Sequence, residues 1–164
     1  MSNDGISIKI ELQADQVTSA FGNLLGFINS GELMKRIGDE VAIYSQDRIT
    51  SEENTAPDGT RWPSLAEATL LRKRKKFGHD KILQQRGLLA QTLKADTANA
   101  TKDYIGVGSS MAYTLIHQFG GKAGRGRKVT IPARPYLGVS AKEKEALERD
   151  VIRWVKEQLY GEGK

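Results

Sequence analysis

The chain has 164 residues, of which 38% are hydrophobic and 27% charged, a composition typical of one folded globular domain and too apolar for a disordered chain. It contains no cysteine, which excludes disulfides, thiolate chemistry and cysteine-ligated metal. The polar N-terminus lacks the pattern of a secretory leader, and no apolar run is long enough to cross a bilayer. We therefore expect a single domain over residues 1–164, with no membrane contact.

The formal net charge of +5 is unevenly distributed. Residues 61–86 hold eight Lys or Arg against two acidic residues, and residues 122–134 hold five against none. Together the two segments carry a net +11, which leaves −6 for the rest of the chain. Such asymmetry favours a polyanion or an acidic protein surface as a partner.

The chain begins with a strand pattern followed by two helical patterns. Apolar and polar side chains alternate over residues 6–12, which predicts a strand within the N-terminal segment 1–14. Apolar residues at helical spacing then predict a helix over 17–28. Ser30 is the expected N-cap of a longer helix that ends near Ser51. The apolar stripe of that helix consists of Met34, Ile37, Val41 and Tyr44.

A loop and a strongly basic helix come next. The turn sequence PDG at 57–59 predicts a loop over 54–64, and Trp62 is expected to anchor this loop to the core. Ser64 and Glu67 have the spacing of a capping box and are expected to open a helix. The helix carries the basic run Arg72, Lys73, Arg74, Lys75 and Lys76.

The basic run has two interpretations. Basic side chains near a helix C-terminus interact favourably with the helix dipole, so the run can be an ordinary solvated face. Its excess over nearby acidic residues favours contact with a polyanion equally well. The residues alone do not decide between the two.

The middle of the chain shows short elements. Leucines between 83 and 93 predict a short helix, and the segments 93–99 and 103–109 predict two strands of a hairpin. A further helix is predicted over Met111–Phe119. Its buried face is expected to hold Ala112, Leu115, Ile116 and Phe119.

The segment from 117 to 138, HQFGGKAGRGRKVTIPARPYLG, is basic and rich in glycine and contains no acidic residue. Residues 120–128 have little apolar content, so we expect a flexible basic loop there. The sequence KVTIP that follows predicts a strand. Ser140 and Glu143 form a second capping-box pattern, which is expected to open the C-terminal helix. Leu147, Val151, Trp154 and Val155 are its expected inward residues.

No residue pattern indicates catalysis. His79 and His117 are the two histidines, and neither has a second histidine or a carboxylate at ligand spacing, so His117 is expected to be a packed, hydrogen-bonded residue. The glycine-rich segments match neither a phosphate-binding loop nor a dinucleotide-binding fingerprint. We therefore expect no catalytic residue, no cofactor and no metal, and a protein that is not an enzyme.

Several motifs occur in a fixed order: PDGTRWPSL, KILQQRGLLAQTL, IGVGS, AYTLIHQFGG and IPARPYLGVS. In this order the chain resembles the phage virion morphogenesis family of Mu-like tail-completion proteins, from about Arg48 to about Trp154. With the element pattern, the resemblance implies an α+β fold. In this fold a small antiparallel sheet packs against two or more long amphipathic helices, and a basic loop extends from it.

The resemblance also implies a function. It implies a non-enzymatic structural protein of the phage neck, which completes the tail and joins it to the DNA-filled head. The expected assembly is a hexameric or dodecameric ring between head-tail connector or adaptor proteins and the tail terminator protein, with DNA passing through the channel. The expected location is the virion neck, after assembly in the host cytoplasm. The alternative is a basic nucleic-acid-binding accessory protein, which the +11 of the two basic segments supports.

The family motif maps onto positions that we expect to be mainly structural. They are Pro57, Gly59, Trp62, Tyr113, His117, Gln118, Phe119, Gly120, Pro132, Pro135 and Gly138. The basic residues in and after the loop are the expected contacts with another subunit, a neighbouring protein or DNA. They are Lys122, Arg125, Arg127, Lys128 and Arg134.

Overall fold

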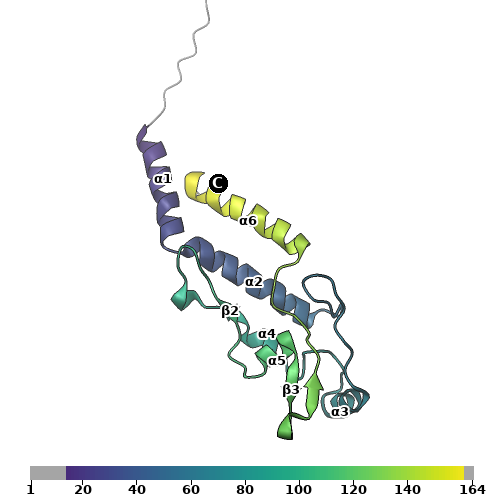
Figure 1. The fold of residues 1–164 in the computed structure, drawn as a ribbon. Helices are drawn as coiled ribbons and strands as arrows, with labels where there is room; N and C mark the ends of the chain where they lie inside the picture. Colours follow the sequence, from purple (N-terminus) through teal and green to yellow (C-terminus); the bar gives the residue numbers. More distant parts are fainter. Residues whose placement is uncertain (1–13, 161–164) are drawn as a thin grey trace, which may run out of the picture.

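The computed structural model describes residues 14–160. The strand predicted over 6–12 lies outside this range, and the last residue of the segment 1–14, Ala14, is already helical. The described part is α+β, as predicted: six α-helices and two small antiparallel sheets of two strands each (Figure 1).

The elements follow one another in this order. The helices are α1 (Ala14–Asn29), α2 (Glu32–Thr50), α3 (Glu67–Phe77), α4 (Leu88–Thr92), α5 (Thr114–Phe119) and α6 (Ala141–Tyr160). The first sheet pairs β1 (Lys94–Ala95) with β2 (Val107–Gly108), and the second pairs β3 (Gly121–Ala123) with β4 (Val129–Ile131). Two short 3-10 turns, Thr97–Asn99 and Arg125–Arg127, lie between the paired strands.

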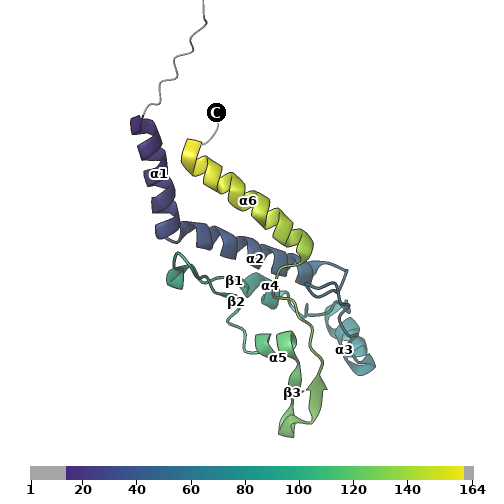
Figure 2. The ribbon, with the colours of Figure 1, turned by 45° about the horizontal axis from the view of Figure 1, so that its top comes forward.

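The long helix α2 runs through the middle of the molecule. Helices α1 and α6 pack together on one side of it, and α4 with the β1–β2 sheet lies on the other (Figures 1 and 2). The guanidinium of Arg36 on α2 lies 5.3 Å from the ring centre of Phe27 on α1 and 5.7 Å from that of Trp154 on α6. Cation–π attraction and burial of both rings therefore join the three helices.

The turn between α1 and α2 differs from the prediction in its cap. Gly31, not Ser30, is the N-cap residue, and it adopts a left-handed conformation with φ +79°. The Ser30 hydroxyl donates back to the carbonyl of Phe27, and it also accepts the N–H of Glu32 at 3.4 Å. A Cβ on Gly31 would lie 3.1 Å from the carbonyl oxygen of Thr101, so the close approach of that loop also requires glycine.

The main hydrophobic core lies on the side of α2 away from α6. Trp62 is 4% exposed there, which confirms that it anchors the 54–64 loop. The buried members are Ile49, Ala56, Trp62, Leu89, Ala90, Leu93 and Tyr136.

The helix α3 does not begin with the predicted capping box. Ala66 is the N-cap residue and makes no side-chain hydrogen bond to the helix. The backbone before the helix is fixed by a distant residue, because the Arg134 guanidinium donates to the carbonyls of Pro63 and Ser64. A long-range contact thus replaces the local cap.

The predicted hairpin over 93–109 forms, but with shorter strands. Lys94 pairs with Gly108 and Ala95 with Val107. The 3-10 turn over Thr97–Asn99 occupies much of the segment expected to extend the first strand.

Candidate functional site

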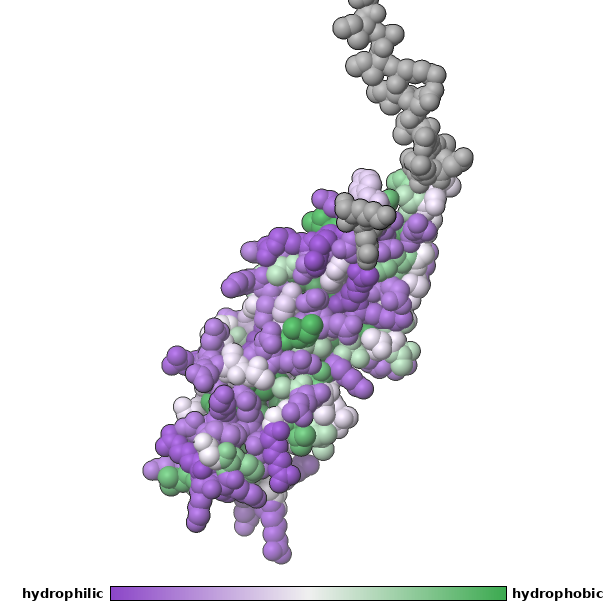
Figure 3. Space-filling view, turned by 180° about the vertical axis from the view of Figure 1, so that it is seen from behind, coloured by the Kyte–Doolittle hydropathy of each residue, from purple (hydrophilic) through white to green (hydrophobic). Residues whose placement is uncertain are grey.

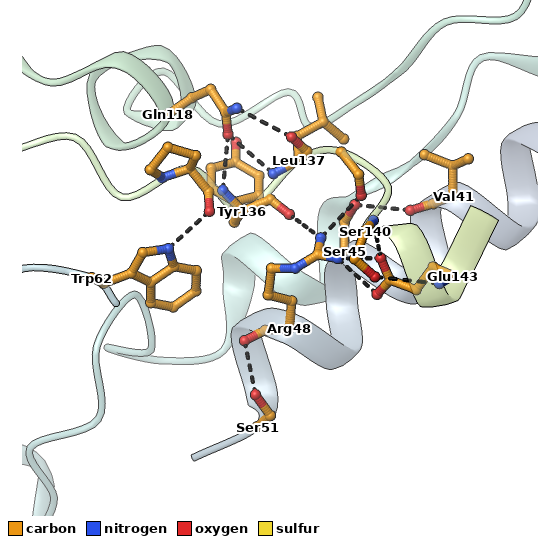
Figure 4. A network of polar contacts seen from close by, with 12 residues as sticks. Val41, Ser45, Arg48, Ser51, Trp62, Gln118, Tyr136, Leu137, Ser140 and Glu143 are labelled. Carbon is orange, nitrogen blue, oxygen red and sulfur yellow. Dashed lines mark hydrogen bonds and ion pairs between the residues drawn. The ribbon is translucent and has the colours of Figure 1, made fainter. Parts of the chain in front are cut away.

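Residues 131–138, IPARPYLG, which we call the motif, are held by side chains from three other parts of the chain. Gln118 on α5 is the first of these (Figure 4). Its side-chain oxygen accepts hydrogen bonds from the N–H groups of Tyr136 and Leu137, each at 3.0 Å, and its amide nitrogen donates to the carbonyl of Leu137 at 3.2 Å. One side chain therefore satisfies three backbone groups of an irregular segment, which need partners when shielded from water.

Arg48 on α2 is the second. Its side chain donates to the carbonyls of Tyr136 at 2.8 Å and Gly138 at 3.0 Å, and to both carboxylate oxygens of Glu143, at 2.7 and 2.5 Å (Figure 4). Glu143 also accepts the N–H of Ser140, whose hydroxyl accepts the N–H of Glu143. The second predicted capping box is therefore confirmed, and Arg48 joins it to the motif and to α2.

The 54–64 loop supplies the third. The indole N–H of Trp62 donates to the carbonyl of Pro135 at 2.8 Å, while Arg134 donates back to the carbonyls of Pro63 and Ser64 at 2.8 and 2.9 Å. A Cβ on Gly138 would lie 2.9 Å from Cγ of Pro57, so the two segments are also in close contact. The buried polar groups around the motif are thus directed at the backbone.

Two predicted surface cations are not at the surface. Arg134 is 4% exposed, and burial lowers its pKa while two carbonyls take up its donors. Lys73 is 7% exposed, and its ammonium donates to the carbonyls of Lys81 and Gln84. Burial lowers the pKa of Lys73, and the nearby carboxylate of Asp80 opposes this effect. Both cations are therefore shielded from solvent and donate to backbone carbonyls of their own chain.

The predicted flexible loop over 120–128 is a hairpin. Gly121 pairs with Ile131, Lys122 with Thr130 and Ala123 with Val129. The strand expected for KVTIP pairs back onto the residues before the turn. Gly124 and Gly126, at φ +77° and +68°, supply the left-handed conformations that reverse the chain. We call residues 121–131 the cationic hairpin.

The base of the cationic hairpin is rigid. Gly120 has φ +73°, and a Cβ there would lie 2.8 Å from the backbone nitrogen of Ala133. The N–H of Arg134 donates to the carbonyl of His117 at 2.7 Å, which joins the chain before and after the hairpin. The hairpin projects from this base at the end of the molecule remote from α1 (Figures 1 and 2).

The side chains of the cationic hairpin point into solvent. Lys122, Arg125, Arg127 and Lys128 are exposed, and no ion pair within residues 14–160 involves any of them. The lower end of the molecule in Figure 3 is mainly hydrophilic, with long side chains projecting from it. On α3, Arg72, Lys75 and Lys76 are exposed as well, while Arg74 pairs with Asp80 at 2.5 Å.

The predicted buried face of α5 is only partly buried. Leu115 is 69% exposed and Phe119 73% exposed. The helix is oriented by Gln118, which turns toward the motif, and Ile116 lies near Gly121. Two large apolar side chains therefore lie beside the start of the cationic hairpin, on the surface.

His117 packs inside, but its ring lacks the hydrogen bond that we expected. Its Nδ1 is buried without a hydrogen-bond partner, and its ring meets that of Tyr113 edge-on at 5.7 Å. Burial lowers the pKa of His117, and the nearby charges of Arg134 and Lys73 lower it further. The folded protein thus favours a neutral imidazole.

This lowered pKa predicts that stability falls as the solution is acidified below neutrality. In the unfolded chain His117 takes up a proton near its ordinary pKa of about 6.5, before the folded protein does. The stabilisation is therefore fully present above about pH 6.5 and is lost as pH falls toward the lower pKa of the folded state. Urea unfolding measured between pH 7.5 and 5 should show this decline, and His117→Gln should flatten it. His79→Gln, which keeps His117, should retain the contribution of His117; equal flattening by both variants would contradict the assignment.

The described residues give no sign of a reactive centre. Between residues 14 and 160 there is no group of three or more His, Cys, Asp or Glu side chains placed to hold a metal ion. No helix in that range has the length and hydropathy needed to cross a membrane. The polar side chains described above can hold the backbone of the motif rigidly. The cationic hairpin can present positive charge at one end of the molecule.

The comparisons with known proteins agree on one family of proteins. Residues 12–156 match the model of the phage virion morphogenesis family, so the match begins well before the Arg48 expected from the motifs. Tail completion protein S of Escherichia phage P2 is 30% identical over 131 residues, 75% of this chain and 79% of that protein. Putative capsid assembly protein G of Escherichia phage Mu is 27% identical over 117 residues, 70% of this chain and 73% of that protein.

A third relative matches over a shorter stretch. Mu-like prophage FluMu G protein 2 of Haemophilus influenzae is 53% identical over 45 residues. The match spans 27% of this chain and one third (33%) of that protein's length. No solved structure matches the chain.

Proposed function

This chain belongs to the phage virion morphogenesis family, and we propose that it is a non-enzymatic structural protein of the phage neck. In this proposal it completes the tail and joins it to the DNA-filled head, as a ring between the head-tail connector and the tail terminator protein. The ring would hold six or twelve copies. Its place would be the virion, after assembly in the host cytoplasm.

The observation that carries the proposal is the use of the buried polar side chains. Arg48, Gln118 and Trp62 all bind the backbone of one irregular segment, and this segment leads directly from the cationic hairpin. A catalytic site would instead direct such groups at a cavity. A rigid base with a projecting hairpin suits a protein that contacts neighbours in a particle.

The relatives support a position at the boundary between head and tail. One is named a tail completion protein and another a putative capsid assembly protein, so the two names refer to the two parts that a neck protein would connect. The family model matches residues 12–156, a range that includes α2 and the segment around Gln118.

Electron microscopy of particles from a phage whose copy of this gene is disrupted tests the proposal. We expect separate DNA-filled heads and separate tails, and joined particles when an intact copy is supplied from a plasmid. A plasmid copy with an early stop codon is the matched control. Joined, intact particles without the protein would contradict the neck assignment, and a lack of filled heads would indicate a role in the capsid instead.

A nucleic-acid-binding role is the second candidate. The specific observation in its favour is a group of exposed cations on the cationic hairpin and α3 that no described ion pair engages, namely Lys122, Arg125, Arg127, Lys128, Arg72, Lys75 and Lys76. Binding through phosphate contacts would weaken steeply as salt rises. Tight, salt-sensitive binding of duplex DNA by the purified protein would favour this candidate, and weak binding at 50 mM salt would count against it.

A further inference from the structure

We propose that the cationic hairpin of one subunit binds an acidic surface on α2 of a second copy of this chain. The acidic surface consists of Asp39, Ile43 and Asp47 on α2 and of Glu52 and Glu53 in the loop that follows. The inference rests on the ring of the proposed function and names the two surfaces that would form its subunit contact.

The acidic surface is defined by helical spacing and exposure. Asp39, Ile43 and Asp47 are four residues apart, so they share one face of α2, and all three are exposed, Ile43 to 45%. Glu52 and Glu53, directly after the helix, are exposed too. Residues 39–58 hold six acidic residues and a single basic one, Arg48.

Within residues 14–160 the acidic surface makes a single ion pair, between Glu52 and Lys81. Arg48 is buried and directed at Glu143, so it does not neutralise the exposed carboxylates. Lys81 approaches Glu52 at 4.0 Å, which is a weak surface pair. Asp47 lies in the last turn of α2, where the helix dipole is negative and disfavours a carboxylate. A cation from another molecule would relieve this repulsion.

The cationic hairpin is complementary in charge to the acidic surface. It carries four exposed cations and also Val129, whose side chain is 53% exposed. On the acidic surface, the exposed apolar residue is Ile43, which lies between Asp39 and Asp47 on the same face of α2. Opposite charges around an apolar contact provide both orientation and burial, the usual composition of a protein interface. The exposed apolar residue on each surface favours a protein partner over DNA, because a phosphate backbone offers nothing for Val129 to pack against.

The two surfaces lie on different parts of the molecule. Helices α4 and α5 lie between α2 and the cationic hairpin in both ribbon views (Figures 1 and 2). A surface that matches a different surface of an identical molecule produces a head-to-tail contact, and repetition of such a contact closes a ring or extends a filament. The geometry therefore points to another copy as the occupant.

Charge reversal in matched sets tests the pairing. The first variant combines Lys122→Glu, Arg125→Glu, Arg127→Glu and Lys128→Glu. The second variant combines Asp39→Lys, Asp47→Lys, Glu52→Lys and Glu53→Lys. Each alone should lose self-association in sedimentation velocity while it keeps the circular dichroism spectrum of the natural protein. Mixing the two variants, or combining all eight changes in one chain, should restore assembly, because every contact then joins opposite charges again.

Chemical cross-linking in assembled particles gives an independent measurement that does not require the isolated protein to associate. The natural chain has no cysteine, so introduced thiols have no background. Val129→Cys combined with Ile43→Cys should give a ladder of linked subunits with a bis-maleimide reagent. The control pairs Val129→Cys with Ile152→Cys, an equally exposed position (55%) on α6, and should give at most dimers.

The outcomes separate this inference from the proposed function. A ladder specific to Ile43→Cys, with rescue by the combined charge reversal, supports the pairing. Equal cross-linking of both cysteine pairs, or normal head-tail joining with only the hairpin reversed, overturns the pairing and leaves the neck role intact. Failed joining with the hairpin charges reversed, and no rescue by the combined variant, also overturns the pairing. That outcome would indicate that the hairpin contacts DNA or a different neck protein.

Discussion

Replacing Arg48 with alanine is expected to lower the free energy of unfolding by about 3–5 kcal/mol. The side chain is 6% exposed, and its removal would leave the carbonyls of Tyr136 and Gly138 without this donor and the Glu143 carboxylate with only the N–H of Ser140. The cost is large because partly buried acceptors would lose their partner and α2 would lose one of its connections to α6.

Chemical denaturation of Arg48→Ala beside Arg153→Ala measures this effect. Arg153 also pairs with a carboxylate, that of Asp150, but its side chain is 61% exposed. An exposed pair contributes at most about 1 kcal/mol, so the control should unfold close to the natural protein. A loss for Arg48→Ala no greater than that of the control would contradict the structural role given to the Arg48 network.

Replacing Trp62 with alanine is expected to cost a similar amount, about 3–5 kcal/mol. The indole is buried in the main core, and its N–H donates to the carbonyl of Pro135. Trp62→Phe should keep most of the packing but leave that carbonyl unsatisfied, at a cost of about 1–3 kcal/mol.

The matched control for Trp62 is Phe119→Ala. Both residues are large aromatics in the family motifs, but Phe119 is 73% exposed. We expect Phe119→Ala to change the free energy of unfolding by less than about 0.5 kcal/mol, as surface substitutions commonly do. Thermal unfolding of all three variants gives the comparison. Equal destabilisation by Trp62→Ala and Phe119→Ala would show that the loop is not anchored through the indole.

Local patterns predicted most of the helices but not all of their ends. The Ser140–Glu143 capping box forms because its two partners lie within one turn and a third residue, Arg48, supports the carboxylate. The Ser64–Glu67 pattern has the same spacing and fails, because Arg134 fixes the preceding backbone from 70 residues away. Spacing alone could not distinguish the two cases, since the difference is a long-range contact.

The side chains that hold the motif could not be predicted from sequence patterns either. Arg48 has the position of an ordinary basic residue near a helix end, and nothing local shows that it points at residues 88 to 95 positions away. Lys73 lies in a run of five cations and yet is the buried one. Long polar side chains reach several ångströms beyond their backbone, so their partners depend on the packing of distant segments.

For the cationic hairpin, the sequence led us to predict too little structure. Glycine and charge in residues 120–128 indicated mobility, whereas the alternation in the residues that follow could have indicated a pairing partner. The strand β4 was predicted from KVTIP, but its partner β3 was not, because the residues Gly121, Lys122 and Ala123 carry no apolar alternation. The predicted surface role of Lys122, Arg125, Arg127 and Lys128 remains a prediction, now for a defined hairpin.

The packing of α1 against α6 has a consequence for how the protein is made. The first described helix rests on the last, so α1 lacks its main partner until residues 141–160 have been synthesised. The ring of Phe27, which contacts the Arg36 guanidinium together with that of Trp154, lacks the α6 side of this cluster until then. Folding of this helical layer can finish only once α6 has been synthesised, and its rate depends on closing a loop of more than a hundred residues. Nascent chains would therefore depend on chaperones during synthesis more than a protein folded from local contacts.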